Sequence, residues 1–404
     1  MRITAVETLR PQIQPNVCLL AVHTDDGLTG LGESFFSASA VEAYLHDVVA
    51  PAILGTQDLL PEQAATRLAP YVGFQAGGIE TRALGALDLA LWDLLGKATG
   101  RRVVDLLGGA LREEIRVYNT CAGPGYVSTS VRQESDNWGL AGPGSKTRPY
   151  EDLDAFLNRP AELAKELRAE GITAMKIWPF DTYAEKTRGT SISDGDLARG
   201  ASVLEQIRSE VSADQMGIMV ELHGFWNRPC AERICAAVAP YAPVWVEDPI
   251  RPDAADALAA LRRSVDVPIA TGETVTGRRG FLPLLDKQAI DVATVDVQWT
   301  GGITEARKVA SLADTFGVPV APHDCTGPVT FAACCHVVMS QPNGMIQETV
   351  RAFLRTWYGE LVEGLPIVEN GVVRLNDEPG LGVRLVAGLA DRPGVLRRVS
   401  RLED

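Results

Sequence analysis

Three glutamates stand at the ends of three consecutive apolar segments: Glu221 in MVELH, Glu247 in WVEDP and Glu273 in ATGET. Their spacing is even and matches one strand-helix unit of a parallel barrel, so neighbouring strands would aim three carboxylates into one mouth. A single glutamate at a strand end is more often solvated or a helix cap. Three anions in register repel one another, and a hard divalent cation with oxygen ligands relieves that repulsion. The triad therefore predicts a Mg²⁺ site with positions open to water and substrate.

The next two segments end in Asp296 (TVDVQ) and His323 (APHDC), which are again one unit apart. A histidine that a buried aspartate orients and makes more basic is a standard general base. A lone histidine would be interpreted as a core residue, but two of the five histidines here follow strands beside the predicted metal site. The second, His223, shares the inward face of Glu221 and is a candidate zinc ligand, acid or substrate-binding group. Glu348, in MIQETV, ends the last strand, and both a structural and a functional role are open for it.

Lys176 and Trp178 lie in the segment TAMKIWPFD, at the end of a predicted buried strand. Side chains alternate along a strand with period two, so both residues point to the same side. A site with a charged amine therefore shares its face with an indole, which cannot accept a proton. Trp178 either forms an apolar or stacking wall of the site or merely packs in the barrel.

The first part of the chain has the pattern of an α+β domain, which we expect over residues 1–115. Residues 17–34 contain two β-rich runs around an Asp-Gly turn, which predicts a hairpin. Between residues 38 and 100 apolar side chains such as Leu84, Leu87 and Leu91 recur three or four positions apart, which predicts helices.

Eight short apolar strands follow, separated by amphipathic helical sequence such as residues 196–211. This alternation predicts parallel β/α units closed into a barrel, with a doubly wound sheet as the alternative. The polar end of each strand is its C-terminal end, where barrel enzymes place their chemistry. The predicted strands are IRVYNTCAG, ITAMKIWPF, GIMVELHG, PVWVEDP, VPIATGE, VATVDVQ, VPVAPHD and GMIQETV.

Residues 122–153 separate the first two predicted strands and are rich in Gly, Pro, Ser and Thr. The segment is longer than an ordinary connection of this kind and is expected to be a functional lid or disordered. Its fragment GPGSKT is similar to a phosphate-binding loop, but Ser145 interrupts the required succession of Gly, Lys and Ser or Thr, so that interpretation is not favoured.

The composition excludes several classes of protein. The chain of 404 residues is 46% hydrophobic and 22% charged, as in an ordinary globular enzyme or binding protein, and its formal charge of -14 disfavours nucleic acid and anionic membranes as partners. Seven cysteines without a C-x-x-C pair predict buried, reduced thiols rather than disulfides or a zinc site. The N-terminus lacks signal-peptide features and no long apolar run occurs, so a cytoplasmic protein is expected.

Taken together, the motifs resemble the enolase superfamily and, within it, the mandelate racemase subgroup of acid-sugar dehydratases and racemases. The resemblance covers nearly the whole chain. It implies a modified (β/α)₇β barrel at residues 116–355, an α+β capping domain at 1–115 and a C-terminal segment at 356–404 that completes the cap. Besides the strand-end glutamates, the motifs are DGLTGLGES at 26–34, DLALWDLLGKATGRRVVDLLGG at 88–109, GGITEARKVA at 301–310 and PHD at 322–324.

The resemblance also implies roles for the catalytic residues. The family's ligands for one Mg²⁺ per subunit match Glu221, Glu247 and Glu273, although the first is an aspartate in many members. The family's dyad, whose histidine removes the proton next to a carboxylate, matches Asp296 and His323.

Two further positions match groups that contact the substrate carboxylate in the family. Glu348 matches the acid of the eighth strand, and Lys176 matches the first lysine of a K-x-K motif. The second lysine, usually the base on the opposite face, is replaced by Trp178. A racemase needs a base on each face of the alpha carbon, so one-sided proton chemistry is expected.

These parts predict an enzyme, a Mg²⁺-dependent dehydratase (a lyase) that removes the alpha proton of an aldonate or aldarate and eliminates the β-hydroxyl. The general acid would be His323 itself or His223, and the product would be a 2-keto-3-deoxy acid. Asp324 is a candidate for substrate binding, as are Asn227 and Arg228. The alternatives are a cycloisomerase, epimerase or racemase of a sugar acid or its lactone, and a non-catalytic sugar-acid-binding barrel. A homo-oligomer is expected from the family.

Overall fold

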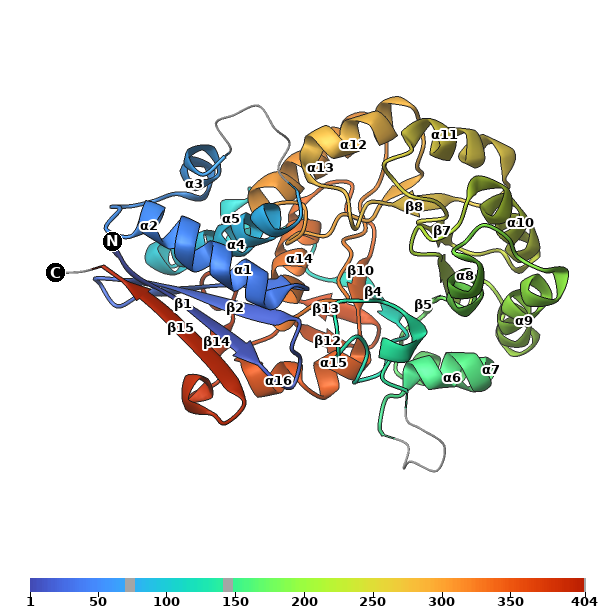
Figure 1. Ribbon diagram of the computed structural model, residues 1–404, viewed down its shortest axis with the longest axis horizontal. Helices are drawn as coiled ribbons and strands as arrows, with labels where there is room; N and C mark the ends of the chain where they lie inside the picture. Colours follow the sequence, from blue (N-terminus) through green and yellow to red (C-terminus); the bar gives the residue numbers. More distant parts are fainter. Residues whose placement is uncertain (70–76, 141–147, 403–404) are drawn as a thin grey trace.

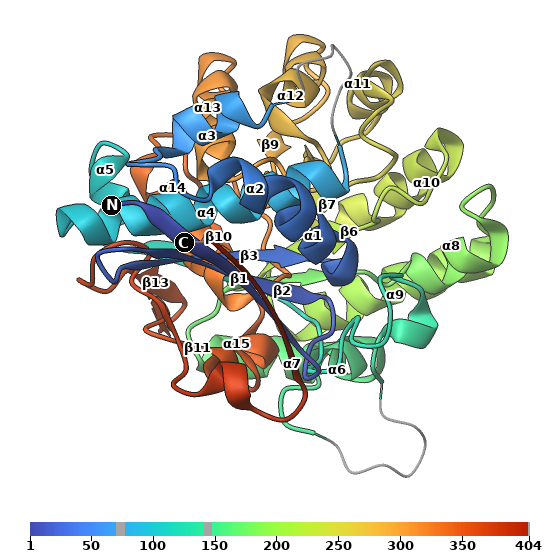
Figure 2. The same ribbon diagram turned by 60° about the vertical axis from the view of Figure 1, so that its left-hand side comes forward.

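The computed structural model describes residues 1–69, 77–140 and 148–402, which form a cap and a barrel side by side (Figure 1). The cap sheet has the antiparallel order β15-β1-β2-β3. Its strands are β1 Ile3–Pro11, β2 Val17–Thr24, β3 Thr29–Phe35 and β15 Val395–Arg401. The predicted hairpin is therefore confirmed as β2 and β3, and the last strand of the chain runs along the first (Figure 2). This pairing confirms that the C-terminal tail completes the cap.

Two glycines of the cap hairpin allow helix α4, Ile79–Thr99, to lie directly on the sheet. A Cβ at Gly30 would lie 2.1 Å from the carbonyl oxygen of Ala90, and one at Gly32 would lie 1.9 Å from that of Ala86. Any side chain at either glycine would push the helix away from the sheet. The helices of the cap are α1 Ala38–Tyr44, the π-helix η1 Leu45–Val49, α2 Ala50–Ile53, α3 Pro61–Arg67, α4 Ile79–Thr99 and α5 Val103–Leu106.

The barrel is a ring of parallel strands in the order β4 to β9, closed by β10, which pairs with β4. This closure confirms the barrel and shows that the doubly wound alternative is wrong. The strands are β4 Ile115–Thr120, β5 Ala174–Ile177, β6 Gly217–Glu221, β7 Trp245–Glu247, β8 Ile269–Thr271, β9 Val292–Ala293 and β10 Gln347–Thr349. The seventh predicted strand, VPVAPHD, makes only isolated bridges, among them Val320 with Ala293 and with Gly344. Its two prolines lack the N–H groups that a regular ladder needs.

Helices surround the ring and short strands follow it (Figure 1). Helices α6 to α11 are Asp152–Asn158, Pro160–Ala169, Asp181–Thr187, Asp194–Glu210, Arg228–Val238 and Ala255–Ser264. Helices α12 to α16 are Gly277–Asp286, Ile303–Thr315, Pro328–Ser340, Arg351–Arg355 and Tyr358–Leu361. The 3₁₀ helices η2 to η4 are Ser135–Asn137, Ala239–Tyr241 and Leu389–Asp391, and strands β11 to β14 are Val362–Glu363, Ile367–Glu369, Val372–Arg374 and Arg384–Leu385.

The tail contacts both parts of the molecule. Its strand β13 pairs with β4 of the barrel, whereas β15 pairs with β1 of the cap. The exact domain limits of 1–115, 116–355 and 356–404 stay predictions. None of the helices in the described part of the chain is long and apolar enough to cross a membrane. All seven cysteines are free, and six of them are buried.

The long segment at 122–153 packs against the cap where it is described. The side chains of Tyr126 and Trp138 are buried. The side-chain amide of Asn16, between β1 and β2, donates to the carbonyl oxygens of Val127 at 2.6 Å and Ser130 at 2.9 Å. The cap thus holds the first half of this segment beside the barrel. The GPGSKT fragment lies outside the described residues.

Candidate active site

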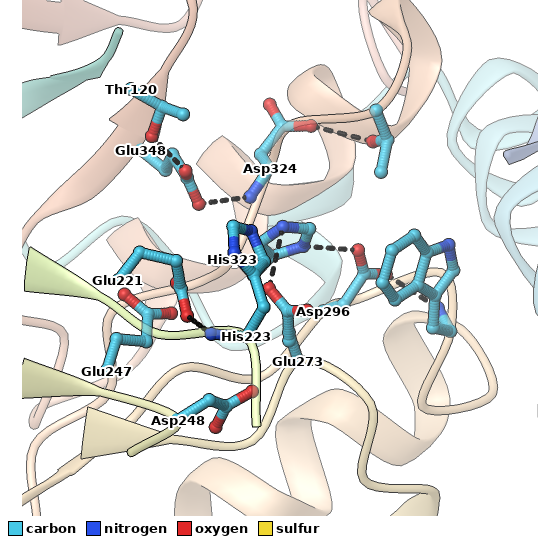
Figure 3. A network of polar contacts seen from close by, with 12 residues as sticks. Thr120, Glu221, His223, Glu247, Asp248, Glu273, Asp296, His323, Asp324 and Glu348 are labelled. Atoms are coloured by element: carbon cyan, nitrogen blue, oxygen red, sulfur yellow. Dashed lines mark hydrogen bonds and ion pairs between the residues drawn. The ribbon is translucent and has the colours of Figure 1, made fainter. Parts of the chain in front are cut away.

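Three glutamates meet at the mouth of the barrel, as predicted. Glu221 and Glu247 are the last residues of β6 and β7 and pair in register, and Glu273 lies two residues beyond β8. All three side chains are buried, and one carboxylate oxygen from each lies within 4.8 Å of the others (Figure 3).

The donor atoms of this triad fit a hard divalent cation. Within the described ranges, Glu221 Oε2 and Glu247 Oε1 are buried without a hydrogen-bond partner. The other oxygens are fixed by the protein: Glu221 Oε1 accepts from the backbone N–H of His223 at 2.8 Å, and Glu247 Oε2 accepts from Trp245 Nε1 at 3.0 Å. Lys176 Nζ lies 3.4 Å from Glu221 Oε2 as an ion pair, but neither this oxygen nor Glu247 Oε1 receives a hydrogen bond. A buried carboxylate oxygen that receives no hydrogen bond is costly, and a bound cation relieves that cost. An all-carboxylate ligand set suits Mg²⁺ better than zinc.

Lys176 connects the triad to the other side of the mouth. Its Nζ lies 3.0 Å from Glu348 Oε1, 3.3 Å from Glu247 Oε2 and 3.4 Å from Glu221 Oε2. Burial alone would lower the pKa of Lys176, but Glu247 and Glu348 outweigh burial and raise it well above its ordinary value. Lys176 is therefore a buried ammonium group that can balance charge on a bound carboxylate.

Asp296 and His323 form the predicted dyad. His323 Nδ1 lies 2.9 Å from Asp296 Oδ2, and His323 Nε2 lies 3.2 Å from Glu273 Oε2 (Figure 3). Burial would lower the pKa of His323, but Glu273, Glu348 and Asp296 outweigh burial and raise it to about 10. A general base must start unprotonated, so His323 can act as one only when the charge of Glu273 is balanced.

A second dyad, which we did not predict from the sequence, joins His223 to Asp181. His223 Nδ1 lies 2.8 Å from Asp181 Oδ2, and both side chains are buried. Burial would lower the pKa of His223, but Asp181 and Glu221 outweigh burial and raise it to about 10. His223 is therefore suited to donate a proton. The only sequence signal was that Asp181 follows the Lys176 strand directly, in WPFD.

Glu348 is held as an anion beside Lys176. It accepts hydrogen bonds from the hydroxyl of Thr120 and from the backbone N–H of Asp324, the latter at 2.7 Å. Burial would raise the pKa of Glu348, but Lys176 and His323 outweigh burial and hold it well below its usual range. The carboxylate of Asp324 accepts from Thr326 Oγ1 at 2.8 Å and is almost fully buried. Asp324 thus contacts the site through its backbone, and substrate binding by its side chain stays a prediction.

Trp178 is enclosed by aromatic rings. Its indole is 1% exposed and lies 5.1 Å from the ring of Phe156, 5.3 Å from that of Tyr126 and 6.1 Å from that of His223. The indole thus packs among these rings and beside His223, and a role for Trp178 as a wall of the substrate site stays a prediction.

A cavity of about 710 Å³ opens beside His223 and Asp248. Its other lining residues include Arg251, Thr274 and Thr276. Asn227 and Arg228, expected near the mouth, have structural contacts instead. Asn227 caps α10 by accepting from the N–H of Cys230 at 3.0 Å, and Arg228 pairs with Glu232 at 2.8 Å.

This fold and this site define a capped barrel enzyme with an acidic triad and histidine dyads at the barrel mouth. Residues 3–108 match the family model of the mandelate racemase / muconate lactonizing enzyme N-terminal domain, and residues 159–388 match that of the enolase C-terminal domain-like family. The chain therefore belongs to the enolase superfamily, in its mandelate racemase subgroup, and is an enzyme. The predicted resemblance is confirmed.

Known proteins are similar over almost the whole chain. A D-galactonate dehydratase from Ralstonia pickettii is 29% identical over 95% of this chain and 92% of its own. A crystal structure of an enolase of the mandelate racemase subgroup from Agrobacterium tumefaciens is 41% identical, covers 99% of both chains and has a TM-score of 0.86. An enolase protein from Sargasso Sea environmental sequence is 39% identical over 100% of both chains, with a TM-score of 0.87.

Proposed function

We propose that the protein is a Mg²⁺-dependent dehydratase of a sugar acid, an aldonate or aldarate, and that its product is a 2-keto-3-deoxy acid. The observation that carries this proposal is the pair of histidine–aspartate dyads on the glutamate triad. The imidazole ring of His323 contacts the carboxylate of Glu273, and the backbone N–H of His223 donates to the carboxylate of Glu221. Dehydration needs both a base for the alpha proton and an acid for the β-hydroxyl. The similarity to a D-galactonate dehydratase supports the same reaction class.

The residues divide the reaction between them. Bound at the triad, Mg²⁺ would act as a Lewis acid toward the substrate carboxylate and balance the glutamate charges. His323 Nε2 takes the alpha proton while Asp296 holds the opposite nitrogen. Lys176 compensates the negative charge that develops on the substrate carboxylate. His223 then donates a proton to the β-hydroxyl, the C–O bond breaks, and water leaves as the double bond forms. The resulting enol tautomerises to the keto acid.

The same contacts argue against racemisation. Trp178 stands where the family usually has a second lysine, and the nitrogen lone pair of an indole belongs to its aromatic π system, so it cannot accept the proton. In this proposal a protonated His223, held by Asp181, serves as the acid rather than as a second base. A cycloisomerase or epimerase with the same triad and dyad remains the alternative, followed by a sugar-acid-binding barrel without activity.

A substrate screen separates these possibilities. The purified protein is incubated with Mg²⁺ and a panel of aldonic and aldaric acids that includes D-galactonate, and keto acids are detected with semicarbazide. We expect a keto acid from at least one panel member and none with His323→Asn. Alpha-proton exchange in D₂O without any keto acid would contradict dehydration and favour isomerisation. If neither the wild type nor His323→Asn turns over any panel acid, and both bind one of the acids with equal affinity, a non-catalytic sugar-acid-binding barrel would be favoured.

Further predictions concern the state of the protein in the cell. We propose a cytoplasmic homo-oligomer that acts on a small carboxylate and binds neither nucleic acid nor membranes. Size-exclusion chromatography with light scattering would test the assembly.

A further inference from the structure

Trp299 lies between the dyad histidine and two residues of the cap. Its ring centroid is 5.1 Å from that of His323 and 5.6 Å from that of Phe36, and the guanidinium carbon of Arg82 lies 4.2 Å from the Trp299 centroid. Phe36 follows cap strand β3, and Arg82 lies in the first turn of α4. We call Phe36, Arg82 and Trp299 the cap clamp.

Phe36 reaches Trp299 through an unusual backbone conformation. Phe36 and Ser37 both have positive φ angles, 68° and 55°, which residues other than glycine rarely adopt. Strained backbone persists only where the surrounding structure holds it, and it is concentrated at functional sites. Here the conformation ends β3 and lets Phe36 pack on Trp299.

Arg82 makes no ion pair within the described ranges, although it is half-buried. Its one side-chain hydrogen bond runs from Nη1 to the carbonyl oxygen of Phe35 at 2.7 Å. The indole face of Trp299, 4.2 Å from the guanidinium carbon, is a cation–π partner of this side chain. Burial lowers the pKa of Arg82, and the carboxylates of Asp296 and Glu273 act in the opposite direction. The contact is reinforced by Gln298, whose Nε2 donates to the carbonyl oxygen of Arg82 at 2.6 Å. The loop that follows Asp296 is thus attached to the start of α4.

Trp299 contacts both members of the dyad. Its backbone N–H donates to Asp296 Oδ1 at 2.6 Å, and the other oxygen, Asp296 Oδ2, lies 2.9 Å from His323 Nδ1. The Trp299 ring also lies against the His323 ring. A displacement of Trp299 would therefore move the imidazole in two ways, by direct contact and through the aspartate.

We propose that the cap clamp positions His323 for proton abstraction, so that the docked cap forms part of the geometry of the general base. The proposal rests on the proposed function in that His323 is taken to be the base. Phe36 and Arg82 are positioning residues, since both contact Trp299 and neither is recorded in contact with the imidazole.

The test compares two substitutions of Arg82 with a control at the same interface. Arg82→Met removes the cation but keeps an unbranched chain. We expect it to lower kcat and the rate of alpha-proton exchange about tenfold or more, with KM changed less than about twofold, because small displacements of a catalytic group cost this much. Arg82→Lys should restore most of the rate, since an ammonium group also binds an indole face.

The control is Thr304→Val. It removes the hydrogen bond from Trp92 Nε1 to Thr304 Oγ1, 2.9 Å, which also joins the cap to the barrel but does not involve the clamp. We expect kcat within about twofold of the wild type, because separate sites act independently. An equal loss of kcat in Thr304→Val would overturn the proposal, since it would reflect general loosening of the cap. A raised KM with unchanged kcat for Arg82→Met would do so too, because it would indicate substrate binding.

A spectroscopic measurement separates failure of this proposal from failure of the proposed function. In protein labelled with ¹⁵N-histidine, the ring signals of His323 are assigned by their absence in His323→Asn. Arg82→Met and the second variant, Phe36→Leu, should shift these signals, whereas Thr304→Val should not. Unshifted signals in both clamp variants would overturn the proposal even if the enzyme is active. If the wild type forms no keto acid and exchanges no alpha proton, the proposed function is contradicted. The shifts of the His323 ring signals in the clamp variants would still test the cap clamp.

Discussion

His223 Nδ1 lies 2.8 Å from Asp181 Oδ2, in a dyad that matches the 2.9 Å contact between His323 and Asp296. The two dyads attach to the outer members of the triad, because His223 binds Glu221 after β6 and His323 contacts Glu273 after β8. Strand β7 lies between these two strands. Two histidine–aspartate pairs are thus held at opposite ends of one row of carboxylates.

Asp181→Asn should stop dehydration without stopping proton abstraction. The aspartate accepts the Nδ1 proton of His223, and its negative charge favours the protonated imidazole, whereas a neutral asparagine removes that charge. We expect the rate of keto-acid formation to fall about 10²–10⁴-fold, the range for loss of a general acid or its orienting carboxylate. Alpha-proton exchange in D₂O, measured by NMR, should continue because His323 is untouched.

The matched control for this prediction is Asp194→Asn. Asp194 pairs with Arg233 at the protein surface and should leave both rates unchanged. If Asp181→Asn loses exchange and dehydration together, His223 is not a separate acid, and elimination by His323 alone would be favoured.

Mg²⁺ should stabilise the fold through the triad. Binding to the native state alone adds about 2.7 kcal/mol to the free energy of unfolding at a hundredfold excess over Kd. We expect a chelator to lower Tm, added Mg²⁺ to restore it, and calorimetry to detect about one site per chain. Glu247→Gln should abolish the Mg²⁺ effect, whereas Glu210→Gln, at the surface salt bridge with Lys165, should keep it. A Tm of the wild type that is indifferent to Mg²⁺ would contradict the metal site.

Local patterns in the sequence predicted most of the fold. The Asp-Gly turn determines the hairpin, and helical periodicity identified α4. The sequence predicted a regular seventh strand, but the structure has only isolated bridges there. An apolar run predicts burial, whereas prolines within the run decide whether a regular hydrogen-bond ladder can form. Short tail strands that cover the barrel or rejoin the cap could be expected, but the pairing of β13 with β4 could not, since it depends on tertiary contacts.

The site was predictable where its residues recur with the barrel repeat. Glu221, Glu247 and Glu273 share that period, as do Asp296 and His323. Asp181 does not, because it begins a helix after the strand of Lys176, and only folding brings it to His223. The contact of Arg82 with Trp299 joins distant segments of cap and barrel, so no local pattern marks it.

Acid should weaken the fold through His336. This histidine is buried in α14, where Nδ1 accepts the N–H of Val104 at 3.0 Å, and burial lowers its pKa to about 4. The unfolded chain, with a pKa of 6.5, binds the proton more readily, so stability is lost as pH falls below 6.5. The full loss at pH 4 would be about 3 kcal/mol.

Urea unfolding at several values of pH between 4 and 8 would measure this loss. His336→Asn is the comparison, because its side-chain oxygen can accept the same N–H but does not titrate. The variant should lose less stability than the wild type over this interval. Equal losses in both proteins would show that other groups dominate.

Trp178→Lys restores the family's usual lysine but should not create a racemase. The indole is enclosed by Phe156 and Tyr126, so a lysine there would leave a cavity and bury a charge. We expect the free energy of unfolding to fall by about 3–5 kcal/mol, as for truncation of a buried tryptophan, while Trp178→Phe should cost less. Urea unfolding and chiral chromatography of a reacted sugar acid would check both points. A stable Trp178→Lys protein that interconverts alpha epimers would contradict this prediction. It would mean that racemisation needs only a base on this face of the site and that the indole of Trp178 prevents it.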